Sequence, residues 1–284
     1  MRSLVLALLV LASTPAAGTG QHRSLGPDVR MHSAFASKFL AKPRDIIVWL
    51  PPGYEKERDR RYPVLYMHDG ANVYVEWRID DIVKPLIASG EVEPLIIVLV
   101  PNGGQQQDRF EDYTWTKPPR AKFGGKAEAY GRMLVEELKP FIDREYRTLP
   151  DAANTGMGGA SLGALVSLHF ALAHPDVFGK LMLMSPALWW DDRLLLRDVG
   201  KLKARPSIRI WLDVGQAESP SMIRDAQALR DTLARKGWKR DADLTYFELP
   251  DGRHDEAWFA RRAGPALKYL FPGGSVKRSG AAAW

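Results

Sequence analysis

The sequence predicts an α/β protein, with helices on both faces of a mostly parallel central sheet. Short apolar runs alternate with helix-forming segments along the chain, and this alternation is typical of the strand–helix–strand units that build parallel sheets. Several runs are apolar throughout, as expected for strands that are covered on both faces. The chain has 284 residues, of which 45% are hydrophobic, so one domain of this class with a large core accounts for its length.

The predicted strands are short segments in which apolar and β-branched residues dominate. They span residues 46–50, 64–67, 95–100, 155–158, 181–184, 208–214 and 244–249. The pattern is weakest in 155–158, because glycine is a poor strand former. Between the strands, 127–146, 162–173 and 222–236 are predicted helices, in which apolar residues recur at helical spacing. Pro140 is expected to kink the first of these helices.

The two ends of the chain differ from the middle. Residues 1–20 have the pattern of a signal peptide, with Arg2, then an apolar run over 4–12, then small residues. That run is too short to span a bilayer, so we expect export to the periplasm or the cell exterior without a membrane anchor. Residues 25–272 form the predicted α/β domain, and 273–284 are a basic tail of small residues that we expect to fray.

Composition narrows the classes of function. The chain has no cysteine, which excludes thiol catalysis, disulfides and a cysteine-linked lipid anchor. The net charge of +6 and the isoelectric point near 9.4 either favour anionic partners or reflect a solvated basic surface. Basic residues are not interleaved with stacking aromatics, and no DNA- or RNA-binding module is recognisable, so no nucleic-acid partner is expected.

Residues 159–163 read Gly-Ala-Ser-Leu-Gly and lie between a predicted strand and a predicted helix. A serine with glycines on both sides in this pattern occupies the apex of a sharp strand-to-helix turn, where its hydroxyl is exposed. The amide of Leu162 would then point toward a developing oxyanion. Ser161 is therefore the candidate nucleophile for acyl transfer. The alternative is a glycine-rich turn in front of a buried helix.

A serine nucleophile needs a general base, usually a histidine. Among the 6 histidines, His254 is the one in a loop between a late predicted strand and a predicted helix; a surface-loop histidine is the alternative. The acid should lie between Ser161 and His254 in the chain. Glu218, just beyond the strand 208–214, is the first choice, and Asp213 inside that strand is the second. A solvated or capping carboxylate is the alternative for each.

A second oxyanion donor is expected from the loop after an earlier strand. An Asp-Gly turn follows the strand 64–67, so the amide of Gly70 or Ala71 could face the nucleophile. His68 and Asp69 could alternatively bind a metal ion, but no second cluster at ligand spacing accompanies them in the sequence. We therefore expect neither a metal nor a cofactor.

Further motifs extend over most of the chain. In order, they are Val-Trp-Leu-Pro-Pro-Gly-Tyr at 48–54, Met-His-Asp-Gly at 67–70, Pro-Asn-Gly-Gly at 101–104, the serine pentapeptide at 159–163, His-Pro-Asp-Val-Phe-Gly at 174–179, Ser-Pro-Ala-Leu-Trp-Trp at 185–190 and Gly-Arg-His-Asp at 252–255. Together, over residues 30–272, they resemble the putative esterase family of α/β-hydrolases. That family includes feruloyl and acetyl-xylan esterases, enterochelin-type siderophore esterases, S-formylglutathione hydrolases and mycolyltransferases.

The resemblance implies the α/β-hydrolase fold, with Ser161 as nucleophile, His254 as base and Glu218 as acid. Two departures from the family are Ala164, where a second glycine is frequent, and Glu218, which is one methylene longer than the common aspartate. The implied substrate is a polysaccharide-linked feruloyl or acetyl ester, or a siderophore trilactone, and acyl transfer to an alcohol acceptor stays open. A non-catalytic binding protein on a hydrolase scaffold is the alternative of a different class.

Two aromatic segments follow predicted strands and are therefore expected on the same rim as the nucleophile. The segment 109–122 is long and polar, and long loops in compact domains often belong to binding sites. An ordinary surface excursion is the alternative. The segment 185–192 could stack on a ring-shaped substrate or pack into the edge of the core. The candidate substrate-binding residues are Arg109, Tyr113, Trp115, Trp189 and Trp190.

Overall fold

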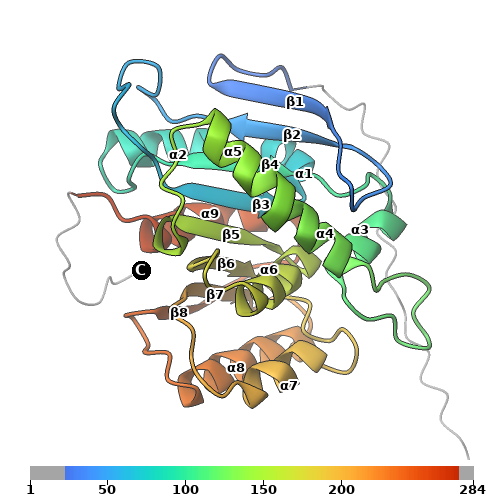
Figure 1. The fold of residues 1–284 in the computed structure, drawn as a ribbon. Coiled ribbons are helices and arrows are strands. Elements are labelled where there is room, and N and C mark those ends of the chain that lie inside the picture. Colours follow the sequence, from blue (N-terminus) through green and yellow to red (C-terminus); the bar gives the residue numbers. More distant parts are fainter. Residues whose placement is uncertain (1–22, 275–284) are drawn as a thin grey trace, which may run out of the picture.

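The computed structural model of the chain describes residues 23–274. The predicted signal peptide at 1–20 lies outside the described residues, and so does the predicted tail from residue 275 onward. Strands and helices alternate along the described part, and helices lie on both faces of one eight-stranded sheet (Figure 1). The predicted α/β class is therefore confirmed.

The sheet has the strand order β1-β2-β4-β3-β5-β6-β7-β8. The strands are β1 (Val29–Phe35), β2 (Arg44–Trp49), β3 (Val64–His68), β4 (Ile96–Val100), β5 (Thr155–Ala160), β6 (Lys180–Met184), β7 (Arg209–Gly215) and β8 (Leu244–Leu249). β1 pairs with β2, and β2 with β4, in antiparallel fashion, whereas all pairs from β4 to β8 are parallel. The carboxyl ends of the parallel strands therefore form one edge of the sheet, which is where such folds carry their sites.

The predicted strands correspond to β2 through β8, and β1 was missed. Most side chains of β1 are exposed, so this edge strand lacks the apolar run that marks the others. β5 is a strand in spite of its glycines, and its neighbour β6 lies so close that a side chain at one of them would not fit. A Cβ at Gly158 would lie 2.6 Å from the Cβ of Met182 in β6, so glycine here permits the strand pairing.

From β3 onward, one or more helices separate each strand from the next. They are α1 (Gly70–Val75), α2 (Ile79–Ala88), α3 (Gln106–Tyr113), α4 (Ala127–Arg132), α5 (Lys139–Glu145), α6 (Leu162–Ala173), α7 (Leu194–Lys201), α8 (Pro220–Arg235) and α9 (Glu256–Leu270). A π-helical segment, Met133–Leu138, joins α4 to α5, so the predicted helix 127–146 is continuous but irregular. Pro140 lies two residues after the end of this segment, in the first turn of α5, where a proline is tolerated.

The predicted loop 109–122 is partly helical, which corrects the sequence analysis. Residues 109–113 form the second half of α3. A capping box starts this helix: the side chain of Gln105 accepts from the third helical amide, and Asp108 accepts from the backbone of Gln105. The polar composition of α3 hid its periodicity, and only the residues after it are irregular.

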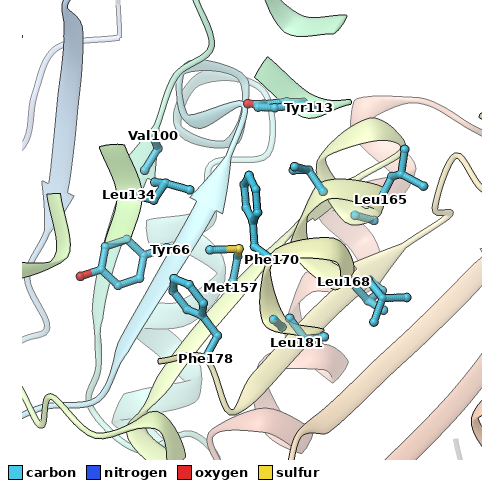
Figure 2. Packing of buried hydrophobic residues seen from close by; sticks show 14 of the residues in the cluster. Tyr66, Val100, Tyr113, Leu134, Met157, Leu165, Leu168, Phe170, Phe178 and Leu181 are labelled. Carbon is cyan, nitrogen blue, oxygen red and sulfur yellow. The ribbon is translucent and has the colours of Figure 1, made fainter. Parts of the chain in front are cut away.

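Each face of the sheet carries its own apolar core. One core lies under α4 to α8, and Figure 2 shows Met157 of β5 and Phe170 of α6 inside it. The other core lies under α1, α2 and α9. Helix α6 is buried along most of its length, which holds its first turn firmly at the sheet edge. Within residues 23–274, no helix combines the length and the apolar character needed to cross a membrane.

Candidate active site

Ser161 lies between β5 and α6, at the carboxyl edge of the sheet. Its backbone angles, φ 58° and ψ −117°, are strained for a residue with a side chain. Three backbone hydrogen bonds maintain this conformation. The Ser161 amide donates to Met184, and the Ser161 carbonyl accepts from Leu165 and from Ala187. The sharp turn predicted from the pentapeptide is present.

The glycines on both sides of the serine allow the turn to pack against β3. A Cβ at Gly159 would lie 3.2 Å from the Gly163 backbone and 3.3 Å from the Cβ of His68. A Cβ at Gly163 would lie 3.2 Å from the same His68 carbon. A side chain at either position would therefore force its neighbours to shift, which favours glycine at each.

Glu218 and His254 are in direct contact. The Nδ1 atom of His254 lies 2.9 Å from Oε2 of Glu218, and the Glu218 side chain is fully buried. A carboxylate bound at Nδ1 leaves Nε2 free to accept a proton. Within residues 23–274, no hydrogen bond yet joins the Ser161 hydroxyl to His254, and such contacts are often long before substrate binds.

One short segment places this pair near the serine. Directly after β6, the Ser185 hydroxyl donates to Glu218, and two residues later the Ala187 amide donates to the Ser161 carbonyl. The segment therefore contacts both Ser161 and the partner of His254. Loops from β5, β6, β7 and β8 converge here, all from the carboxyl edge.

Two glycines bring the loops of Glu218 and His254 together. Gly215 ends β7 and Gly252 lies in the loop after β8, and a Cβ on Gly215 would collide with the Gly252 carbonyl. The Ala217 amide donates to that same carbonyl at 3.0 Å. The spacing between acid and base is therefore set by a close backbone contact.

The environment of Glu218 favours its ionised form. Burial raises its pKa, but the hydrogen bonds from His254 and Ser185 lower it by more, so the pKa lies below its ordinary value. Oε1 accepts from the Ser185 hydroxyl at 2.5 Å and from the Gly215 amide at 2.9 Å. A charged carboxylate can in turn stabilise an imidazolium at His254.

Asp213, the second candidate acid, has different partners. It is fully buried in β7. Its Oδ1 lies 2.6 Å from Nη1 of Arg262, and its Oδ2 accepts from the Trp211 indole at 2.7 Å. The geometry therefore favours Glu218 over Asp213 as the partner of His254.

Backbone amides for an oxyanion are available at two helix starts. Leu162 is the first residue of α6, and Gly70 and Ala71 begin α1. The first amides of a helix have no acceptor within it. A Cβ on Gly70 would collide with the carbonyl carbon of Leu99, so only glycine lets the α1 loop lie this close to β4.

Arg109 holds the residue before that loop. Its guanidinium makes a two-pronged ion pair with Asp69, with contacts of 2.9 and 2.8 Å, and it approaches the Ala160 carbonyl at 3.4 Å. Asp69 also accepts from the Asn102 amide. The His68 ring instead contacts Tyr130 at 2.9 Å. His68 and Asp69, which the sequence offered as alternative metal ligands, therefore have separate protein partners.

The predicted aromatic residues divide into exposed and buried ones. Tyr113 has no exposed surface, and its hydroxyl accepts from the Asp69 amide, so it cannot contact a substrate in this conformation. Trp190 is also buried, with its indole donating to Thr116. Trp115 stacks on His169 at a ring distance of 3.9 Å. Trp189 is 47% exposed and is the one of these aromatics with a large surface open to a ligand.

For several residues at the site, the sequence analysis did not predict the role that they have in the structure. Asp69, Asn102 and Ser185 each directly follow or lie close behind a predicted strand, which was the available signal. Arg262 gave no such signal, because a single arginine inside a helix usually faces solvent. Glu256 accepts from Asn72 and from Trp77 and so ties α9 to the α1 region.

Known proteins resemble this chain over most of its length. The family described as putative esterase matches residues 37–269. The uncharacterised protein YjcH of Bacillus subtilis (strain 168) is 30% identical over 240 residues, which cover 83% of this chain and 95% of that protein. An endo-1,4-beta-xylanase/feruloyl esterase of Xylanibacter ruminicola is 30% identical over 209 residues, which cover 69% of this chain but 26% of that longer protein.

Solved structures have the same fold. A crystal structure of the enterobactin esterase FES from Shigella flexneri, in the presence of enterobactin, superposes with a TM-score of 0.71 at 20% identity. The match covers 85% of this chain and 57% of that one. The family match, with the eight-stranded sheet, agrees with the fold that the motifs imply. The chain therefore belongs to the putative esterase family, and it is a carboxylic ester hydrolase with the α/β-hydrolase fold.

Proposed function

We propose that the chain is an exported serine esterase that uses Ser161, His254 and Glu218 as its catalytic triad. The contact that carries the proposal is the 2.9 Å approach of Glu218 to Nδ1 of His254, next to the segment that contacts Ser161. The strained turn at Ser161, a residue that is partly exposed, supports its role as the nucleophile. Export is supported by the signal-peptide pattern of residues 1–20.

The reaction would proceed through an acyl-enzyme. His254 takes the hydroxyl proton at Nε2 while the Ser161 oxygen attacks the ester carbonyl. The amides of Leu162 and of Gly70 or Ala71 stabilise the tetrahedral oxyanion. His254 then protonates the leaving alcohol, and it later activates the water that releases the acid.

The substrate that we favour is a polysaccharide-linked feruloyl or acetyl ester. The name of the Xylanibacter ruminicola relative, a xylanase/feruloyl esterase, supports this class. Trp189 offers an exposed aromatic face on the segment that follows β6, suited to stacking on a sugar or phenolic ring. Arg109 lies at the same rim with part of its side chain exposed and could contact a polar group of the substrate.

A siderophore trilactone is the second candidate substrate. It is favoured by the fold likeness to the enterobactin esterase of Shigella flexneri. A feruloyl ester and a catecholate siderophore both carry an aromatic ring, so Trp189 does not separate these two substrates. Acyl transfer to an alcohol and ligand binding without catalysis are the further outcomes that the experiment below distinguishes.

The first experiment is reaction of the purified protein with a fluorophosphonate probe, beside the Ser161→Ala variant. Labelling of the wild type alone is the expected result, because the probe requires an activated serine. Turnover of feruloyl, acetyl-xylan and catecholate-lactone esters then ranks the substrates, and added alcohol acceptors detect transfer. Unchanged hydrolysis by Ser161→Ala contradicts the mechanism, and a folded wild type without labelling or turnover supports a binding protein.

A further inference from the structure

A group of buried polar side chains contacts Glu218 at Oε1, the oxygen that does not face His254. Ser185, Asp213 and Arg262 are each at most 2% exposed, and they come from the end of β6, from β7 and from α9. The Ser–His–acid mechanism uses none of them directly. Burying such groups costs free energy unless their contacts are complete, so their arrangement calls for an explanation.

The hydrogen bonds in this group have a fixed direction. Nη1 of Arg262 lies 2.6 Å from Oδ1 of Asp213 and 3.0 Å from the Ser185 hydroxyl oxygen. An arginine can only donate, so the Ser185 oxygen must accept this bond. The single hydroxyl proton of Ser185 is then directed to Glu218, whose Oε1 lies 2.5 Å away. The arginine thereby orients the serine, and the serine orients the carboxylate.

The charges in the group reinforce this arrangement. Nη2 of Arg262 lies 3.7 Å from Oε1 of Glu218, so a permanent positive charge faces the acid from behind. Asp213 is the nearer counterion and holds Arg262 by the shorter contact, at 2.6 Å. The Trp258 carbonyl accepts from Nε of Arg262 at 3.2 Å, which ties the guanidinium to the first turn of α9.

We propose that Ser185 and Arg262, with Asp213 as counterion, are positioning residues that aim the Glu218 carboxylate at His254. None of the three touches the reacting atoms; they act through Glu218. This inference rests on the proposed triad, which it deepens by naming the residues that fix its acid.

The first test is the kcat and KM of Ser185→Ala with an ester that the wild type hydrolyses. We expect kcat to fall about tenfold, since one hydrogen bond to a charged group is lost, with KM unchanged. Thr148→Val is the matched control, because Thr148 is also buried and also donates to a carboxylate, that of Asp143 at 2.7 Å. Thr148 pairs with Tyr62 at the amino end of β3, away from the site.

The same change is then made in a Glu218→Ala background. If Ser185 acts through Glu218, Ser185→Ala has no further effect on kcat there. A wild-type kcat in Ser185→Ala, or the same tenfold loss with and without Glu218, overturns the proposal. Because Arg262 alone cannot be removed without leaving Asp213 unpaired, the second variant is Asp213→Asn with Arg262→Met, which removes both charges. It should lose kcat in the same Glu218-dependent way.

A readout without catalysis separates this inference from the proposed function. The tautomer of His254, measured by 15N NMR, should be mainly Nδ1–H in the wild type, because Glu218 accepts that proton. In Ser185→Ala it should shift toward the Nε2–H form preferred by free imidazole. Absence of esterase activity in the wild type would contradict the proposed function. Independently of activity, an unchanged His254 tautomer in Ser185→Ala would refute the positioning role.

Discussion

His68 is buried at the end of β3, beneath the serine turn, and we expect it to reduce the stability of the folded protein in acid. Burial lowers its pKa from 6.5 to about 4, because the charged ring would have to leave water. Between these values the unfolded chain binds a proton that the folded chain does not, so stability falls as the pH falls. The whole shift corresponds to about 3 kcal/mol, of which about 2 kcal/mol is already lost at pH 5.

The assay is urea denaturation of the wild type and of His68→Asn between pH 8 and pH 5. Asparagine does not titrate, and its amide can still bond the Tyr130 hydroxyl that His68 contacts. The variant should be less stable at pH 8 but should lose about 2 kcal/mol less than the wild type on acidification. Parallel losses in the two proteins would refute the assignment of this pH dependence to His68.

Three further predictions concern the site. Glu218→Ala should lower kcat by about a thousandfold or more, whereas Asp213→Ala should mainly lower the midpoint of thermal unfolding, because it leaves Arg262 unpaired. The measurement is kcat per folded molecule of each variant. A larger loss of kcat in Asp213→Ala than in Glu218→Ala would assign the acid to Asp213. Gly70→Ala should lower the free energy of unfolding in urea by about 1–3 kcal/mol and should also reduce kcat. Wild-type values of both quantities would contradict a role of Gly70 in the oxyanion loop. Trp189→Ala should raise KM for aromatic esters but not for acetyl esters, and equal changes for both would exclude ring stacking.

The placement of Ser161, His254 and Glu218 at one edge of the sheet was accessible from the sequence for one physical reason. The carboxyl ends of parallel strands lie at one edge of their sheet. Residues that directly follow predicted parallel strands are therefore expected at the same edge of the sheet. The apolar runs of β3, β4 and β7 are unambiguous, so errors of one or two residues at their ends did not matter.

Burial of individual side chains could not be predicted in the same way. Tyr113 and Trp190 occur in polar surroundings in the sequence, yet both point inward, because α3 and the segment after β6 pack their aromatic faces against the core. Trp189, one residue from Trp190, points outward. Neighbouring residues in an irregular segment have no periodicity from which to tell inside from outside.

The buried arginine illustrates a different limit. Arg262 follows Arg261 in α9, and two adjacent arginines give no sign of which one is buried. Its burial depends on Asp213, which is 49 residues earlier in the chain, and on the hydroxyl of Ser185. A single sequence contains no pattern that links these three positions, since each is ordinary in its local context.

The choice of glutamate at position 218 follows from the same contacts. The two oxygens of one carboxylate serve partners on opposite sides, with Ser185 and Gly215 at Oε1 and His254 at Oε2. Aspartate would withdraw the carboxylate by about 1.5 Å, the length of one C–C bond, which is more than a hydrogen bond tolerates. The close backbone contact between Gly215 and Gly252 limits how far the loop of residue 218 can move to compensate. Glu218→Asp must therefore give up either the contact with His254 or the buried contacts behind it, so the longer acid and the buried network that orients it are adapted to each other.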